Sequence, residues 1–350
     1  MSYCRTYHAQ HHHQVIQHIV KQPVRPSIGA LNKRSTVVWD LYEIERGIDQ
    51  QQLKRVQRHM QTHSNCDVVI NLSHENLSPV YNGLAVFDQF IKLWNPLQVT
   101  VWCSQLDTLA ELEHRNSGIR TQQVNFWEYA TSMHAPTPLP KLTSTHRISS
   151  LNRRYSQQRA QLLYGMRHHT DEFSYTFGAG DPWGDTADLI YQEQEWRYHD
   201  DVHLRDSILQ WQSTAKPWRQ LANDINCWEY DHTWQFTAAA DIALVVESRH
   251  TQPPNRQCAF ATEKTFRPIA LGKPIIVCGQ SSIIRTLNSW GYQTINTHSD
   301  VQRVIELAQH ICTMPNSEYQ AQLTQWQQSA QANQQVFQTR TATKPLAAAR

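Results

Sequence analysis

The sequence predicts an α/β protein whose strands form mostly parallel sheets. From about residue 27 to residue 312, short apolar, β-branched runs alternate with polar stretches whose apolar residues recur at helical spacing. Such alternation of strands and helices is typical of parallel sheets. Hydrophobic residues make up 40% of the 350-residue chain, which is enough to build real cores. At roughly 100–200 residues per domain, this length allows two domains.

The first part of the chain is expected to hold a flexible arm, a domain and a linker. Residues 1–26 are polar and rich in His and Gln, and the run His11–His13 fits a solvated tail better than a metal site, because no buried ligand set lies nearby in the sequence. Three prolines within residues 136–144 predict a linker. Within the domain, residues 27–135, the pattern predicts strands at Thr36–Asp40, Cys66–Leu72 and Gln98–Trp102, and helices at Gln50–His63 and Asp107–His114.

A second α/β domain is predicted over residues 145–312. Residues 313–350 form a Gln/Ala-rich tail that we expect to begin as a helix and to fray near its end. In this domain the pattern predicts strands at Arg147–Leu151, Phe173–Phe177, Ala240–Val246 and Pro274–Cys278, and helices at Gln157–Met166, Thr265–Leu271 and Ser281–Ser289.

Charge and cysteine usage narrow the class of protein. The net charge is +2, whereas dedicated nucleic-acid binders usually carry a basic face, so nucleic acid is not the expected partner. The seven cysteines are scattered and form no C-x-x-C, which suggests free thiols in a reducing compartment. The N-terminus has no apolar segment typical of a secretion signal, and no run of about 18 apolar residues could span a membrane. We therefore expect a cytoplasmic protein.

The pattern that carries most chemistry lies between residues 245 and 279. A predicted buried strand ends at Glu247, and a helix opens at Thr262, with Glu263 and Lys264 in its first turn. Open α/β sheets bind ligands at the carboxyl ends of their strands, and a helix N-terminus suits phosphate. A lysine there can bind a diphosphate, and a glutamate can accept two hydrogen bonds from a ribose diol. There are plainer alternatives to a ligand site. Glu263 could simply complement the helix dipole, and Lys264 could be a solvated surface charge.

This pattern, Glu-Ser followed by Thr-Glu-Lys and Gly-x-Pro-Ile, resembles the donor-binding motif of the α1,3-fucosyltransferase family. The resemblance also extends to uncharacterised glycosyltransferase-like proteins with a Thr-Glu-Lys core. It implies a GT-B-like fold, with two Rossmann-like domains and a cleft between them. It further implies that Glu263 holds the nucleotide ribose, that Lys264 contacts the diphosphate and that Phe260 lies near the base. The implied donor site also includes Glu247, Ser248 and Thr262.

A weaker match precedes the second domain's first predicted helix. Asn152 and Arg159 resemble the Asn and diphosphate-clamping Arg of the family, and Arg153 or Arg154 could substitute for Arg159. The plainer reading of these arginines is a solvated helix face. The connection between Glu247 and Glu263 is longer than in typical fucosyltransferases, and Ser248 follows Glu247 without the usual Asn, so the preferred base and sugar stay open.

An inverting transfer needs a general base, normally a carboxylate. The sequence lacks the two glutamates eight residues apart that retaining GT-B enzymes often show, which favours inversion. Glu75, which follows a predicted strand, is our candidate, and the neighbouring His74 is the alternative base. The plainer alternative for Glu75 is an acidic residue in the first turn of a helix, beside a Ser cap. Glu43, Glu45 and Glu128 are weaker candidates. No Asp-x-Asp occurs, so we expect no metal.

The sequence thus predicts a metal-independent, inverting glycosyltransferase. Its C-terminal domain would bind a nucleotide sugar, and its N-terminal domain would bind a glycan or another hydroxyl acceptor. The alternative is a non-catalytic nucleotide-sugar or glycan-binding protein on the same fold. An enzyme that attaches sugar to nucleic acid is a third reading, which the near-neutral charge disfavours.

Overall fold

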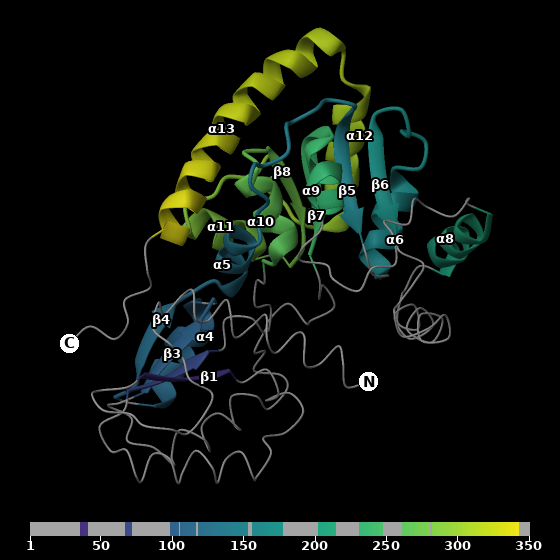
Figure 1. Cartoon of the computed structure of the whole chain (residues 1–350). Helices are drawn as coiled ribbons and strands as arrows, with labels where there is room; N and C mark the ends of the chain where they lie inside the picture. The colour runs from purple at the N-terminus through teal and green to yellow at the C-terminus, as the bar shows by residue number, and fades with distance from the viewer. Residues whose placement is uncertain are drawn as a thin grey trace. The chain divides into compact units, whose positions relative to one another are not determined.

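The computed structural model of the chain describes residues 36–40, 67–71, 99–104, 106–116, 118–152, 156–177, 202–214, 231–247, 261–280 and 282–342. The chain forms two compact units. The first contains residues 1–133, 252–260 and 339–350, and the second contains residues 134–251 and 261–338. Each unit holds its own parallel sheet (Figure 1).

The sheet of the first unit has the sequential order β1-β2-β3-β4, with all neighbours parallel. Its strands are β1 (Thr36–Asp40), β2 (Asp67–Asn71), β3 (Val99–Cys103) and β4 (Arg120–Gln123). The β3 strand is buried along its whole length. Helix α4 (Leu106–Arg115) connects β3 to β4 and packs against both, and α5 (Phe126–Met133) follows β4.

The sheet of the second unit has the order β6-β5-β7-β8 and is also parallel throughout. Its elements, in chain order, are β5 (His146–Asn152), α6 (Gln157–Gly165), β6 (Phe173–Phe177), α8 (Val202–Thr214), α9 (Asp231–Ala238), β7 (Ala240–Val246), α10 (Glu263–Ala270), β8 (Ile275–Cys278), α11 (Ile283–Ser289) and α12 (Val301–Thr313).

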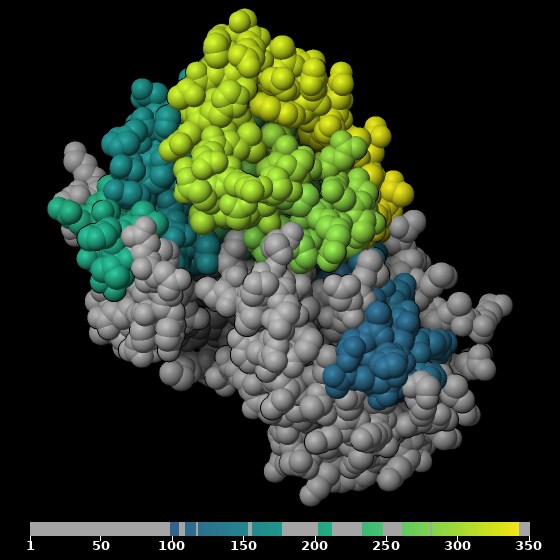
Figure 2. Space-filling view, turned by 180° about the vertical axis from the view of Figure 1, so that it is seen from behind, coloured from purple at the N-terminus to yellow at the C-terminus, as the bar shows by residue number. Residues whose placement is uncertain are grey.

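Helices cover both faces of this second sheet, because its strands bury side chains on both sides. Alternate strand residues such as Ile148, Ile242 and Leu244 share one core cluster with residues of α6 and α12. On the other face, α9 packs against β5 and β7, and α10 packs against β7 and β8. Seen from behind, the described residues that follow α10 in the chain, coloured green to yellow, cover a broad part of the surface of this unit (Figure 2).

The last element, α13 (Asn316–Ala342), is a 27-residue helix that runs along the outside of the second unit's helices (Figure 1). Its buried residues are Tyr319, Leu323, Ala330, Asn333 and Phe337, which follow one another at intervals of three, four or seven residues and so lie on one face. Its final residues belong to the first unit. There the Arg340 guanidinium forms a bidentate ion pair with the buried Glu128 of α5, in which two guanidinium nitrogens lie 2.7 and 3.0 Å from the two carboxylate oxygens.

The predicted α/β fold with parallel sheets is therefore confirmed. The predicted strand over Ala240–Val246 matches β7, and the predicted helices at Gln157–Met166 and Ser281–Ser289 correspond to α6 and α11. The helix expected at Gln50–His63 lies outside the described residues. The structure adds β4, α5, α8, α9 and α12, which the sequence pattern did not predict.

Candidate functional site

The order of the strands in the second unit creates a point where ligands commonly bind. The chain leaves β5 through α6 on one face of the sheet, and it leaves β7 through α10 on the other. The neighbouring strands β5 and β7 therefore send their connections in opposite directions, which is a topological switch point. Polar side chains that gather at the carboxyl ends of these two strands are the natural candidates for a binding site.

Thr262 begins α10 as its N-cap. Its backbone is extended, and its hydroxyl accepts a hydrogen bond from the Lys264 N–H at 3.3 Å. Threonine is a favoured N-cap because its side chain satisfies one of the free N–H groups of the first turn. The cap fixes Glu263 and Lys264 as the first two residues of α10, at the edge of the sheet where β7 ends.

Glu247 follows the last residue of β7 and is only 1% exposed. Its carboxylate accepts hydrogen bonds from the Thr262 N–H at 2.8 Å, from the Thr262 hydroxyl at 2.7 Å and from the Thr265 hydroxyl at 2.6 Å. All three donors belong to the cap and first turn of α10. The Glu247 side chain is thus bound to the start of α10.

Among the predicted site residues that the structure describes, Glu263 and Lys264 keep partial contact with solvent, with side chains 19% and 18% exposed. The Lys264 ammonium lies 3.4 Å from a Glu263 carboxylate oxygen and donates to the Thr262 hydroxyl at 3.1 Å. Burial acts to raise the pKa of Glu263, but Lys264, Arg267 and a backbone N–H lower it by more, so the net pKa lies below its ordinary value. Glu263 therefore carries its negative charge at neutral pH.

Asn152 and Arg159 lie at the same edge of the sheet but are buried. Asn152 is the last residue of β5, and its side-chain amide donates to the Ser150 hydroxyl at 2.9 Å. Arg159 is 3% exposed, and its guanidinium donates to the carbonyl of Val246, the last residue of β7, at 3.2 Å. Arg159 thus connects α6 to the end of β7, and the solvated helix face is ruled out for it.

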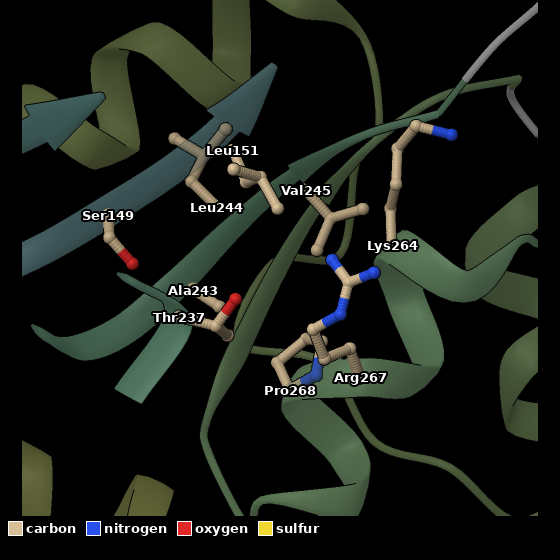
Figure 3. A pocket seen from close by; sticks show the side chains of 9 residues that line it. All are labelled: Ser149, Leu151, Thr237, Ala243, Leu244, Val245, Lys264, Arg267 and Pro268. Carbon is tan, nitrogen blue, oxygen red and sulfur yellow. The ribbon is translucent and has the colours of Figure 1, made fainter. Parts of the chain in front are cut away.

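A small pocket lies between the sheet and α10 (Figure 3). Leu151 of β5 and Val245 of β7 give it an apolar side, and Ser149 adds a hydroxyl. Figure 3 shows the Arg267 guanidinium directed from α10 toward Val245, whereas the Lys264 ammonium extends beyond the start of the helix. The pocket therefore offers an apolar surface beside a cationic one.

Arg267 is a site residue that the sequence analysis did not single out. It is buried, its guanidinium lies 5.7 Å from the ring centre of Trp234, and it contributes to the lowered pKa of Glu263. A signal was present in the sequence, because Arg267 follows Lys264 by three residues and so shares its face of the helix.

Five predicted site residues lie outside the described residues: Glu75, Arg153, Arg154, Ser248 and Phe260. Glu128, a weaker candidate for the general base, is described, and its carboxylate is held by Arg340. Within the described ranges, no group of three or more His, Cys, Asp or Glu side chains could hold a metal ion. In the same part of the chain, no helix has the length and apolar character needed to cross a membrane.

Comparison with known proteins gives distant structural similarities. No family model matches the chain, and no curated protein matches it. The fold is similar to a chain of the Glycosylation Associate Protein (Gap123) complex from Streptococcus agalactiae, with 12% identity and a TM-score of 0.44 over 95% of this chain and 55% of that one. It is also similar to the N-terminal domain of trehalose-6-phosphate phosphatase from Candida albicans, with 10% identity and a TM-score of 0.44 over 93% of this chain and 74% of that one. The chain thus spans about half the length of the first of these proteins.

Proposed function

We propose that the protein is a GT-B-like glycosyltransferase that moves a sugar from a nucleotide-sugar donor to an acceptor hydroxyl. The observation that carries the proposal is the position of Glu263 and Lys264. Both stand in the first turn of α10, at the carboxyl edge of a parallel sheet and beside its switch point, and both are partly exposed. A cation at a helix N-terminus suits a diphosphate, and a neighbouring ionised carboxylate suits the hydroxyls of a ribose.

In the proposed reaction, the acceptor hydroxyl attacks the anomeric carbon of the sugar from the face opposite the diphosphate. A bond forms between the acceptor oxygen and this carbon, while the bond to the diphosphate oxygen breaks and its electron pair leaves with the nucleoside diphosphate. The acceptor proton passes to a carboxylate base, for which Glu75 remains our candidate. Lys264 stabilises the charge that develops on the leaving group.

The buried Arg159 is the second cation in the proposed diphosphate site. Its guanidinium is hydrogen bonded to the end of β7, so it adds positive charge beneath the binding edge while it holds the strand. Because the sequence has no Asp-x-Asp, the proposal assigns the neutralisation of the diphosphate to Lys264, Arg159 and the N–H groups of α10.

A non-catalytic nucleotide-sugar-binding protein is the second candidate. The observation that favours it is the burial of Asn152 and Arg159, which bind neighbouring parts of the protein in this structure. The two candidates share the binding site and differ only in turnover. Release of free sugar or its transfer to an acceptor, above a protein-free control, supports the enzyme; donor binding without either supports the binding protein.

Binding is tested first by a thermal-shift screen of ADP, CDP, GDP, UDP and dTDP and their common sugar conjugates. A ligand that binds only the folded state raises the melting temperature by mass action. Calorimetry then compares the wild type with Glu263→Ala and Lys264→Ala. The matched controls are Glu306→Ala and Arg303→Ala, which remove exposed charges from the first turns of α12. We expect both site variants to lose affinity and both controls to retain it; unchanged affinity in the site variants contradicts the proposal.

A further inference from the structure

Glu247 connects the end of a rigid strand to the start of a helix. Its own backbone N–H donates to the carbonyl of Cys278 at 2.9 Å, so Glu247 continues the pairing of β7 with β8. Its buried carboxylate binds Thr262 and Thr265 across sequence separations of 15 and 18 residues. The Glu247 side chain therefore forms a bridge between β7 and α10. Its backbone is fixed in the sheet, and its carboxylate holds α10.

The oxygen atoms of this carboxylate are already occupied. One accepts from the Thr262 N–H and the Thr265 hydroxyl, and the other accepts from the Thr262 hydroxyl. Both threonines are buried as well, and the Lys264 ammonium is 4.0 Å away. A ligand that sought the Glu247 carboxylate would have to displace protein hydrogen bonds to a charged group, which are among the stronger ones.

We infer that Glu247 and Thr265 form a positioning pair that holds the first turn of α10 in place for the ligand, and that neither touches the ligand. This inference rests on the proposed function, and it revises the expected role of Glu247 as a donor contact. Thr265 had no expected role.

The need for such a pair follows from the connection between β7 and α10. Residues 248–260 separate Glu247 from Ala261 in the sequence, whereas the Glu247 carboxylate joins the end of β7 to α10 directly through Thr262 and Thr265. A carboxylate at a helix N-terminus is also stabilised by the partial positive charge of the helix end. The Glu247 bridge therefore orients Glu263 and Lys264 before any ligand arrives, which lowers the cost of ordering them on binding.

Thr265→Val tests the pair with the smallest change. Valine keeps the shape of threonine but loses the hydroxyl that donates to Glu247, whereas Thr265→Ser keeps the hydroxyl. Thr100→Val, at a buried position of β3 in the first unit, is the control for the same substitution. Glu247→Gln, which keeps the side-chain shape and removes the charge, is the second variant should Thr265→Val fold poorly.

Two measurements on the full chain separate the inference from the proposed function. Hydrogen exchange without ligand should show faster exchange of the Thr265 and Phe266 N–H groups, both bonded to Thr262, in Thr265→Val. Calorimetry with the nucleoside diphosphate that the screen selects should show about tenfold weaker binding, the loss expected for about one hydrogen bond to a charged group. Thr265→Ser should restore both properties, and Thr100→Val should change neither.

The outcomes are distinct. Unchanged exchange in Thr265→Val overturns the positioning role, and so does faster exchange with wild-type affinity. Equal losses in Thr100→Val also overturn it, because they would show a general effect on stability. If the wild type binds none of the five diphosphates while exchange in Thr265→Val is faster and is restored by serine, the proposed function fails and the positioning of α10 stands.

Discussion

Lys273 should make the second unit more stable as the pH rises above about 8. The residue follows α10 and is only 1% exposed, and its ammonium donates to the Thr237 carbonyl at 2.6 Å. Burial lowers the pKa of Lys273 from 10.5 to about 8, and the nearby Asp241 offsets part of this effect. Folding therefore requires a lysine to be buried in its charged form at neutral pH.

The sign of the effect follows from proton binding. Between about pH 8 and pH 10.5 the unfolded chain holds the Lys273 proton and the folded chain has released it, so stability rises with pH in this window. The full difference between these two pKa values corresponds to about 3 kcal/mol, of which about 2 kcal/mol develops between pH 7 and pH 9.5. Below about pH 8 the contribution is absent.

Lys273→Met removes this titration while it keeps an unbranched chain of similar length. Urea unfolding of the wild type and of Lys273→Met, followed by tryptophan fluorescence, would be measured at pH 7 and pH 9.5. Relative to the variant, the wild type should gain about 2 kcal/mol over this interval, because groups common to both proteins cancel in the comparison. Lys141→Met, at an exposed lysine, should follow the wild type. Equal pH dependence in the wild type and Lys273→Met would show that the pKa of Lys273 is not lowered by folding.

Two further predictions concern other buried groups. Arg340→Met should lower the free energy of unfolding, measured in urea, by about 3 kcal/mol, because it leaves the buried Glu128 carboxylate without its main cation. Arg303→Met, which removes an exposed ion pair, should lower it by less than about 0.5 kcal/mol. Equal losses in the two variants would contradict the importance of the Glu128–Arg340 pair. Burial raises the pKa of the Cys278 and Cys312 thiols to about 12, so iodoacetamide at pH 8 should modify both far more slowly in the folded protein than in urea. Mass spectrometry of the labelled peptides measures both rates, and similar rates in the two states would show that these thiols are accessible.

The sequence pattern was sufficient for the buried strands, and it failed for β4 and for the length of α13, which lack a strong apolar pattern. β7 was predicted because Ile242–Val246 is a continuous apolar run that ends at the polar Glu247. β4 was missed because its sequence, Arg-Thr-Gln-Gln, is wholly polar and only half-buried at the end of the sheet's strand order. The length of α13 was not predicted, since its buried face includes Ala330 and Asn333, which look like the Gln/Ala-rich surroundings.

The candidate site shows the same division between local and long-range information. The helix start at Thr262 could be predicted from a capping residue followed by Glu263 and Lys264, because an N-cap is a local property. The role of Glu247 could not, since its carboxylate meets Thr262 and Thr265 only after the sheet and α10 pack together. For Arg159, the hydrogen bond to Val246 likewise depends on α6 packing beside β7.

Hydrogen exchange of the full chain, with and without the nucleoside diphosphate that the screen selects, is the most direct test of a nucleotide site at the start of α10. We expect slower exchange of the N–H groups of residues 263–266 when the nucleotide is bound, with no change at residues 301–304, which begin α12. Protection confined to other parts of the chain, or no protection under conditions that saturate binding, would contradict a nucleotide site at the start of α10.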